Sequence, residues 1–220
     1  AYLNKVEKVI STGSVSSYPS KTSLPFSEDN LWNGYPEEIN SSYGIAKRII
    51  HTQSLSYYKQ YKFKSILLLL TNLYGPKDNF NPKSSHVIAA LIKKFVEGKI
   101  YKKKFVEVWG DGRSTRDFCY IDDIVDGLIS TAKIYKKISP LNLGSGKEIS
   151  IKKIANLIKN EVGFKGKIKW LKNKPSGPRR RYLKIIKAKR EIGFKPKISI
   201  KEGIKRTISW YLKKNKYTDK

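Results

Sequence analysis

The amino-acid sequence predicts an α/β fold in which strands and helices alternate around a parallel sheet. The apolar run Ser65–Thr71 is typical of a parallel strand that is covered on both faces. Segments with helical spacing of apolar residues alternate with such runs, at 42–58, 87–96, 122–132, 151–162 and 200–213. The chain has 220 residues, which is enough for one large domain or one and a half.

The other elements are predicted from local patterns. Residues 6–11 form an apolar run that predicts a buried strand ending near Ser14. Residues 17–39 are rich in Pro, Ser, Asn and Gly, which predicts a long functional loop. Alternation at 105–109 predicts a strand, and the glycines of the next three residues, 110–112, favour a tight hairpin.

The second half of the chain continues the alternation. Residues 140–143 read as a strand, and Ser150 is expected to cap the helix that follows it. Asp122 and Asp123 lie in the first turn of a predicted helix, where the helix dipole favours negative charge, so we interpret them as a helix-start and packing pair.

Composition excludes several classes of protein. The single cysteine, Cys119, rules out an internal disulfide framework and a cysteine-based metal site, and we expect it to pack as a small hydrophobe. A reducing cytoplasm is therefore the expected compartment. No apolar run approaches the roughly 18 residues of a membrane span. Methionine is absent and the chain starts at Ala1, which suggests a start within a domain.

The formal net charge of +28 allows two interpretations. One is a surface that attracts a polyanion. The other, which we favour, is a lysine-rich solvent face, because the excess is mostly lysine, extends along the whole chain and accompanies no nucleic-acid-binding motif. Either surface would suit a substrate that carries a diphosphate.

Ser14, Tyr43 and Lys47 form the candidate catalytic group. Tyr43 and Lys47 are four residues apart in a predicted helix and therefore share a face. An ammonium near a phenol favours the phenolate, which makes the tyrosine a usable acid or base for a carbonyl or alcohol oxygen. A serine hydroxyl at the end of the preceding strand can bind the same oxygen. The Tyr-x-x-x-Lys spacing alone is weak, and the order of the surrounding elements strengthens it.

That order resembles the extended short-chain dehydrogenases/reductases, and within them the GDP-L-fucose synthases. The resemblance covers nearly the whole chain. The stretches that carry it are SSYGIAKR, TNLYGPKDNFNPKSSHVIAALIKKF, VWGDGRSTRDFCYIDD, NLGSGKEISI and ISIKEGIKRTISWYL.

The resemblance implies a truncated Rossmann-like parallel sheet joined to a smaller α/β lobe. The partial NAD(P)-binding domain is expected at 1–76 and 116–145, and the lobe that binds a nucleotide sugar at 77–115 and 146–220. A homodimer through the helix that carries Tyr43 is also expected.

The implied activity is an NADPH-dependent epimerase-reductase that converts GDP-4-keto-6-deoxymannose to GDP-L-fucose. Tyr43 and Ser14 would bind the ketone oxygen, which stabilises the charge that develops there. Lys47 would also bind the nicotinamide ribose. The residues implied to line the cofactor, NADP(H), are Lys47, Thr71, Asn72, Leu73, Tyr74 and His86.

Proton transfer at the two carbons beside the ketone is implied for His86 and for position 16. The family has a cysteine at the second of these positions, and this chain has Ser16. A hydroxyl is far less acidic than a thiol, whose pKa is about 8.5. A related GDP-sugar ketone reductase with little or no epimerase activity is therefore an alternative. A non-catalytic remnant that binds anionic partners is another.

The substrate is expected to contact Lys94, Trp109, Arg116 and Lys174. Arg116 matches a diphosphate-binding arginine, whose fork suits that task. Lys94 stands where the family has arginine, and Trp109 could equally be a core aromatic at a strand end. Lys174 with Pro175 matches a lysine-proline pair. The basic run 179–181 could neutralise phosphates or form a solvated loop.

One expected motif is missing from the sequence. It has no G-x-x-G-x-x-G or G-x-G-x-x-G at a strand-to-helix turn, where dinucleotide-binding folds hold the pyrophosphate. The resemblance places about a hundred family residues before Ala1, by the length of the first strand–helix units of such folds. We therefore expect the chain alone to bind NADPH poorly or not at all, and to need a separate N-terminal segment.

Overall fold

The computed structural model describes residues 1–174 and 177–217. The chain forms two compact units. The first unit comprises 1–72, 122–147 and 181–197, and the second unit comprises 73–121, 148–180 and 198–220. Each unit is described by itself.

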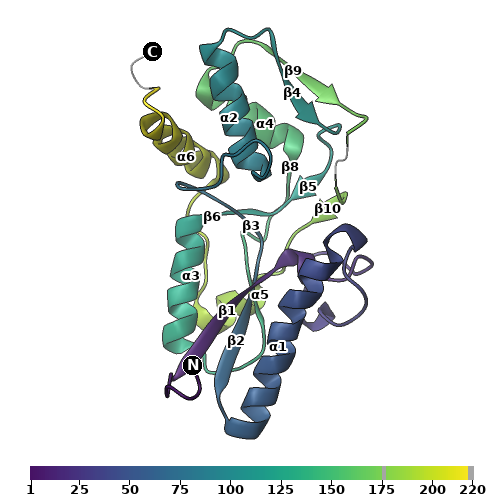
Figure 1. Ribbon diagram of the computed structural model, residues 1–220, viewed down its shortest axis with the longest axis vertical. Helices are drawn as coiled ribbons and strands as arrows, with labels where there is room; N and C mark the ends of the chain where they lie inside the picture. The colour runs from purple at the N-terminus through teal and green to yellow at the C-terminus, as the bar shows by residue number, and fades with distance from the viewer. Residues whose placement is uncertain (175–176, 218–220) are drawn as a thin grey trace. The chain divides into compact units, whose positions relative to one another are not determined.

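A parallel sheet with the strand order β1-β2-β7 is the centre of the first unit. Its strands are β1 (Lys8–Ser14), β2 (Lys64–Leu70) and β7 (Leu141–Leu143). The middle strand is apolar and buried from Ser65 to Leu70, which confirms the prediction of a parallel strand covered on both faces. Helix α1 (Ser41–Tyr61) lies along β1 and β2 (Figure 1).

Short 3-10 turns order the long loop between β1 and α1. They are η1 (Val15–Ser17), η2 (Glu28–Asn30) and η3 (Glu38–Asn40). Tyr18, Phe26 and Leu31 from this loop pack with Leu67 and Leu69 of β2 in a buried cluster. The loop is therefore part of the core. Helices α3 (Ile121–Ile134) and α5 (Ile186–Ile192) complete the unit.

The second unit is built around three helices and short strands. Helices α2 (Val87–Ile100), α4 (Ile151–Val162) and α6 (Ile200–Lys214) share a core whose fully buried members include Ile92, Phe95 and Ile158. As predicted, Ser150 caps α4, and its side chain accepts a hydrogen bond from the backbone of Lys153 at 3.2 Å. The strands are β3 (Asn72–Tyr74), β4 (Phe105–Trp109), β5 (Thr115–Arg116), β6 (Phe118–Tyr120), β8 (Ile149–Ser150), β9 (Lys167–Leu171) and β10 (Arg180–Arg181).

The prediction of a hairpin at 110–112 is wrong. Strand β4 pairs in parallel with β9, and the next strand, β5, pairs with β8 and β10 in another small sheet. Gly112 has a positive φ of 76°, which favours glycine. A Cβ at this position would also lie 2.7 Å from the ring of Trp170. The glycine permits a close approach of the turn to β9.

One segment lies in a different unit from the one that the sequence analysis expected. Residues 181–197 belong to the first unit, although the sequence placed them in the lobe. They do so because α5 packs against β7 and because Phe26 exchanges backbone hydrogen bonds with Tyr182 and Lys184. The sequence analysis also missed α5 and β9, whose lysine-rich patterns looked like turns. No helix in the described part of the chain is long and apolar enough to cross a membrane.

Candidate functional site

The carboxyl edge of the β1-β2-β7 sheet gathers the first group of predicted site residues. Ser14 ends β1 and lies in register with Leu70, the last residue of β2. Leu70 in turn is in register with Leu143 at the end of β7. Thr71 directly follows β2 at the same edge. Ligands of open α/β sheets bind at this edge.

Tyr43 and Lys47 lie on one face of the first two turns of α1. The Nζ atom of Lys47 is 5.6 Å from the centroid of the Tyr43 ring, and 53 % of Tyr43 is exposed. Lys47 therefore places a positive charge over the face of the Tyr43 ring, and the exposed ring can reach a ligand. The two residues thus share a face of α1, as their spacing predicted.

Gly44 determines how closely the start of α1 approaches the Ser14–Ser16 segment. A Cβ at Gly44 would lie 2.6 Å from the backbone oxygen of Ser16 and 3.1 Å from Pro36. Helix α1 could not pack here with any larger residue after Tyr43 without a shift of the backbone. The missing side chain therefore brings the turn that carries Tyr43 against the turn that carries Ser16.

Arg48 anchors the same helix to the long loop. Only 4 % of this residue is exposed, and it donates hydrogen bonds to the backbone oxygens of Ser17 at 2.7 Å and Gly34 at 2.8 Å. Its guanidinium also lies 5.5 Å from the ring centroid of Trp32. Burial lowers the pKa of Arg48. The sequence analysis missed this residue, and its position directly after Lys47 was the only available signal.

The two serines at the sheet edge have defined hydrogen bonds. The Oγ atom of Ser14 accepts from the backbone N–H of Ser16 at 3.1 Å, and the Oγ atom of Ser16 accepts from Nη1 of Arg181 at 3.4 Å. Arg181 also pairs with Glu37 through Nη2 at 2.5 Å. Both hydroxyls act as acceptors in these contacts, which leaves their own protons for other partners.

The stretch predicted to line the cofactor crosses from one unit to the other. Thr71 is buried in the first unit, and its backbone N–H donates to Leu143 at 3.2 Å. Asn72 also belongs to the first unit, whereas Leu73 and Tyr74 belong to the second unit. Tyr74 is buried between Tyr120 and Gly203. Its side chain therefore serves the core of the second unit.

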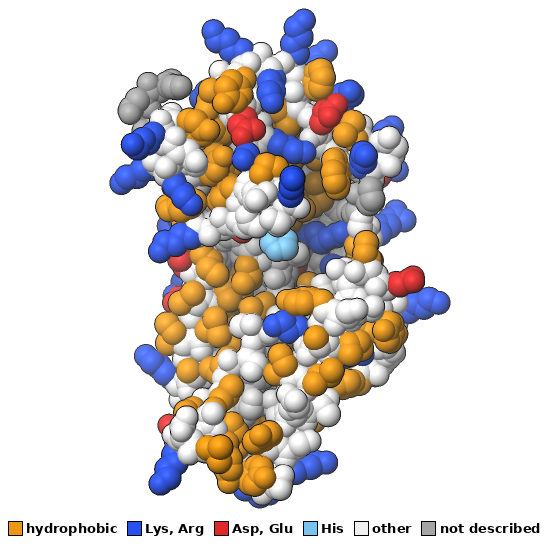
Figure 2. Space-filling view, viewed as in Figure 1, with side chains coloured by type: hydrophobic (Ala, Val, Ile, Leu, Met, Phe, Trp, Pro, Cys, Tyr) orange, Lys and Arg blue, Asp and Glu red, His pale blue; other side chains and the backbone are white. Residues whose placement is uncertain are grey.

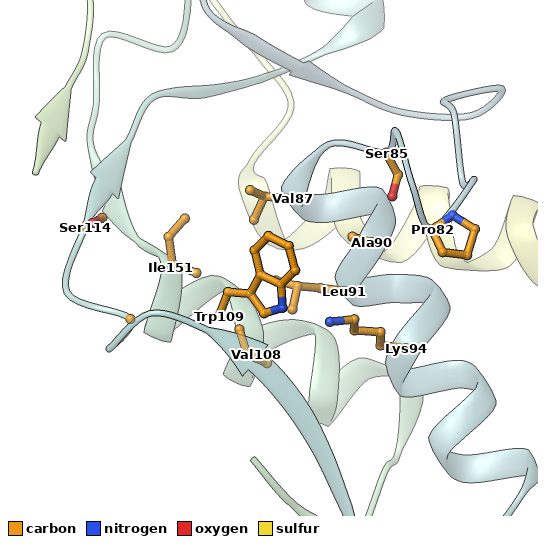
Figure 3. Close-up of a pocket in the computed structure, with 11 residues that line it drawn as sticks. Pro82, Ser85, Val87, Ala90, Leu91, Lys94, Val108, Trp109, Ser114 and Ile151 are labelled. Atoms are coloured by element: carbon orange, nitrogen blue, oxygen red, sulfur yellow. The ribbon is translucent and has the colours of Figure 1, made fainter. Parts of the chain in front are cut away.

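A pocket in the second unit contains two of the predicted substrate residues. It has a volume of about 260 Å³ and lies between the first turns of α2, the end of β4 and the start of α4. Trp109 and Lys94 extend into it from β4 and α2 (Figure 3). Its other lining residues are mostly apolar or small: Pro82, Ser85, Val87, Ala90, Leu91, Val108, Gly112, Ser114 and Ile151.

The pocket combines a flat apolar surface with one cation from α2. Trp109 is 59 % exposed, so it is not the core aromatic that the sequence also allowed. The Nζ atom of Lys94 donates to the backbone oxygen of Glu107 at 2.9 Å, and burial of part of the side chain lowers the pKa of Lys94. An apolar concave site with a few polar groups is typical of sites for small organic ligands.

The remaining basic candidates are not among the lining residues of this pocket. Arg180 pairs with Glu148 and Arg181 pairs with Glu37, so both arginines have carboxylate partners. Arg116 lies on β5 and donates to the backbone oxygen of Thr115 at 2.7 Å. Lys174 is exposed in the turn after β9, and its expected neighbour Pro175 lies outside the described residues.

His86 belongs to the second unit, unlike Tyr43 and the two serines. It is the exposed residue that precedes α2, next to the pocket residue Val87. Cys119 is buried, as expected, and Asp123 accepts a hydrogen bond from the backbone of Lys197 at 2.9 Å, which is a packing role. The sequence analysis did not identify Glu37, Gly44 or the pocket residues Ser85 and Ser114.

Known proteins match the chain over most of its length. A GDP-L-fucose synthase of rice, named as probable, is 40 % identical over 94 % of this chain, and the match covers 63 % of that protein. The enzyme of the same name from Escherichia coli is 33 % identical over 96 % of this chain and 68 % of its own. The chain thus spans about 63 % of the length of the first of these relatives.

Solved structures of known proteins have a similar fold. A GDP-L-fucose synthetase from Naegleria fowleri has a TM-score of 0.93 and 27 % identity, over 100 % of this chain and 69 % of that one. A GDP-6-OMe-4-keto-L-xylo-heptose reductase from Campylobacter jejuni has a TM-score of 0.88 and 33 % identity, over 97 % of this chain and 72 % of that one. These matches confirm the predicted Rossmann-like α/β fold. The profile of the NAD dependent epimerase/dehydratase family matches residues 1–144, and the chain therefore belongs to this family.

Proposed function

We propose that this chain carries the ketone-reducing and substrate-binding residues of an NADP(H)-dependent enzyme that acts on a GDP-linked 4-keto sugar. The observation that carries the proposal is the packing of the first turns of α1, which bear Tyr43 and Lys47, against the turn that follows Ser14. Gly44 lets the first turns of α1 pack against the segment that follows Ser14. The relatives named above as GDP-L-fucose synthases support the nucleotide-sugar class.

The residues of this edge would perform the proton chemistry. Tyr43 would donate its proton to the ketone oxygen, and Lys47 would stabilise the phenolate that remains. Ser14 would donate a hydrogen bond to the same oxygen, since its own oxygen already accepts from the backbone of Ser16. NADP(H), when bound, would supply the hydride. Lys47, Thr71 and Asn72 would hold its nicotinamide half, and Thr71 and Asn72 directly follow β2 at the sheet edge.

The pyrophosphate half of NADP(H) lacks a matching feature in this chain. A strand-to-helix turn rich in glycine usually holds that group, and the sequence contains none. We therefore infer that the dinucleotide needs a further segment. This is tested by titrating NADPH into the chain alone and into the chain co-expressed with the first third of the rice relative. Tight binding by the chain alone would refute this inference.

The pocket around Trp109 and Lys94 would bind the nucleotide part of the substrate. Its volume of about 260 Å³, its exposed indole ring and its single lining ammonium suit a planar base or a sugar next to an anionic group. Binding of GDP, measured by calorimetry, tests this role without any need for catalysis. We expect Lys94→Glu, which replaces the lining cation with an anion, to weaken it strongly.

The extent of epimerisation separates two candidate reactions. The first is the epimerase-reductase reaction of GDP-L-fucose synthases. The second is reduction with little or no epimerisation, which Ser16 and its contact with Arg181 favour. A similar structure named as a GDP-mannoheptose C4 reductase, from Campylobacter jejuni, is 32 % identical to this chain and supports the second candidate.

The two reactions are distinguished in deuterated water. The enzyme, supplied with NADPH and GDP-4-keto-6-deoxymannose, should transfer hydride to carbon 4 in either case. Deuterium at both carbons 3 and 5 of the product indicates the epimerase-reductase, and deuterium at neither indicates the reductase. The absence of any NADPH oxidation, with the co-expressed segment present, would contradict both.

A further inference from the structure

Ser16 has a cationic neighbour, Arg181, to which the proposed reaction assigns no role. It is the middle residue of the 3-10 turn η1, and it is only partly exposed. Its backbone N–H donates to Ser14, and its Oγ atom lies 3.4 Å from Nη1 of Arg181. The residue is therefore fixed at its backbone and contacted by a cation at its side chain.

Arg181 is itself held in place. Only 11 % of its side chain is exposed, and its Nη2 atom is 2.5 Å from Oε2 of Glu37. Burial lowers the pKa of Arg181, and Glu37 opposes that effect. A partly buried guanidinium without such a partner would be costly. Glu37 therefore both stabilises the charge and fixes the direction of the fork.

The chemical consequence follows from the donors and acceptors. A guanidinium has five N–H donors and no acceptor, so the Ser16 oxygen can only accept in this contact. The hydroxyl proton of Ser16 must then point elsewhere. A nearby cation also disfavours protonation of the oxygen and favours loss of its proton. Ser16 is thus arranged as a donor and is a poor acceptor of a proton from carbon.

We propose that Arg181, held by Glu37, is a positioning residue that turns the Ser16 hydroxyl into a hydrogen-bond donor toward an oxygen of the substrate sugar. The proposal rests on the function proposed above. It connects three distant segments: the turn after β1, the residue before η3 and the strand β10. It also predicts that proton abstraction from carbon does not pass through position 16.

A thiol at position 16 reports the effect of Arg181 without catalysis. The variant S16C places a titratable group there, and buried Cys119 gives a slow background that the unsubstituted chain measures. We expect the pKa of the introduced thiol, from the pH dependence of its alkylation, to be about one unit lower in S16C than in S16C/R181M. Arg180 provides the matched control, because its ion pair is with Glu148. The control S16C/R180M should give the same thiol pKa as S16C.

Two further measurements complete the test: the thiol pKa in S16C/R181K and the kinetics of R181M. S16C/R181K, which keeps a cation, should retain part of the thiol shift, and circular dichroism should show that each variant is folded. In the reductase assay R181M should lower kcat about tenfold with KM for the GDP-sugar nearly unchanged, since one oriented donor is lost, and R181K should recover part of kcat.

Equal thiol pKa values in S16C and S16C/R181M would overturn the proposal, as would an unchanged kcat in R181M. A thiol shift in a chain that does not reduce the ketone would support the orientation at position 16 and count against the proposed function. The two failures are therefore distinguishable.

Discussion

The edge of the sheet in the first unit and the pocket in the second unit are built in opposite ways. The sheet edge presents polar side chains that contact backbone atoms, as at Ser14 and Arg48, and Gly44 lets the backbone approach closely. The pocket presents apolar side chains around an exposed indole, Trp109, and one ammonium, Lys94. The first arrangement suits bond-making at one atom, and the second suits retention of a larger group.

The distribution of charge supports this division. On the visible face, Lys and Arg side chains are spread over both units and do not gather into one patch (Figure 2). Several cations of the sequence are also neutralised by carboxylates, as in the pairs of Arg180 and Arg181. On this face the excess of positive charge is therefore dispersed, whereas in the pocket of the second unit Lys94 lies among mostly apolar residues.

The largest effect that would test the comparison is expected for Tyr43→Phe. Removal of the phenolic proton should lower kcat for ketone reduction by roughly 10²–10⁴-fold, because the oxygen loses its acid. Binding of GDP should not change, since the pocket belongs to the other unit. The measurements are NADPH oxidation with the co-expressed segment and GDP calorimetry on the same preparation. Weakened GDP binding in this variant would contradict the assignment of reduction to the sheet edge and of GDP binding to the pocket.

Trp109→Ala is the reciprocal change, with a smaller expected effect. Loss of a stacking surface should weaken GDP binding by roughly 10–100-fold, from about 1–3 kcal/mol of stacking free energy. The value of kcat at saturating substrate should remain within a few-fold of the unsubstituted enzyme. Trp210 in α6, which stacks on Phe80, is the control, because it does not line the pocket. A fall in kcat equal to the fall in affinity would show that the pocket also aligns the reacting carbon.

Gly44→Ala tests the close packing at the sheet edge, because a gain in helix propensity and a steric clash have opposite effects on stability. Alanine normally stabilises a helix by about 1 kcal/mol relative to glycine. Here the new Cβ would lie 2.6 Å from the Ser16 oxygen, a backbone atom that cannot move aside alone. We expect a net loss of roughly 1–3 kcal/mol of stability and a clear fall in kcat, as for an overpacked site.

The control for this substitution is Ala46→Gly, at an exposed position of the same helix. It should cost about 1 kcal/mol through helix propensity alone and leave kcat unchanged. Urea unfolding and the reductase assay measure both quantities. If Gly44→Ala were more stable than the unsubstituted chain, α1 would not approach the Ser14–Ser16 segment as closely as described.

The sequence predicted the elements whose patterns are governed by burial. The run 65–71 indicated β2 because both of its faces are covered, and Ser150 indicated the start of α4 because its side chain caps the helix. The turn at 110–112 was misassigned because glycine signals a turn but not the partner of the strand before it. The partner, β9, lies about sixty residues later by the register of the pair.

The site residues divide along the same line. The shared helix face of Tyr43 and Lys47 was predictable, because residues four apart on a helix are neighbours. The contact between Arg181 and Glu37 was not predictable, since it joins positions 144 residues apart and is created by the tertiary fold. The membership of 181–197 in the first unit was missed for the same reason.

The smallest expected effect concerns Glu28, a buried carboxylate in the loop of the first unit. It is 8 % exposed, and its Oε1 atom accepts a hydrogen bond from the backbone N–H of Asn142 at 2.9 Å. Burial raises the pKa of Glu28 above its usual 4.5, although hydrogen bonds and Lys187 oppose the shift. A raised pKa means that the folded state binds the proton more tightly than the unfolded state. Its contribution to stability is therefore present below pH 4.5 and is lost as the pH rises through the raised value.

Glu28→Gln should remove this pH dependence while it keeps an oxygen that can accept from Asn142. Glu148 in the second unit gives the opposite sign, because hydrogen bonds from Arg180 lower its pKa. Its contribution is present above pH 4.5 and is lost as the pH falls through the lowered value. Urea unfolding of the unsubstituted chain, E28Q and E148Q between about pH 3 and pH 8 spans both reference values. Relative to E28Q, the unsubstituted chain should lose stability as the pH rises, whereas relative to E148Q it should gain stability. Parallel curves for all three proteins would mean that neither carboxylate is held as described, and that the loop packed under β7 is more hydrated than its burial indicates.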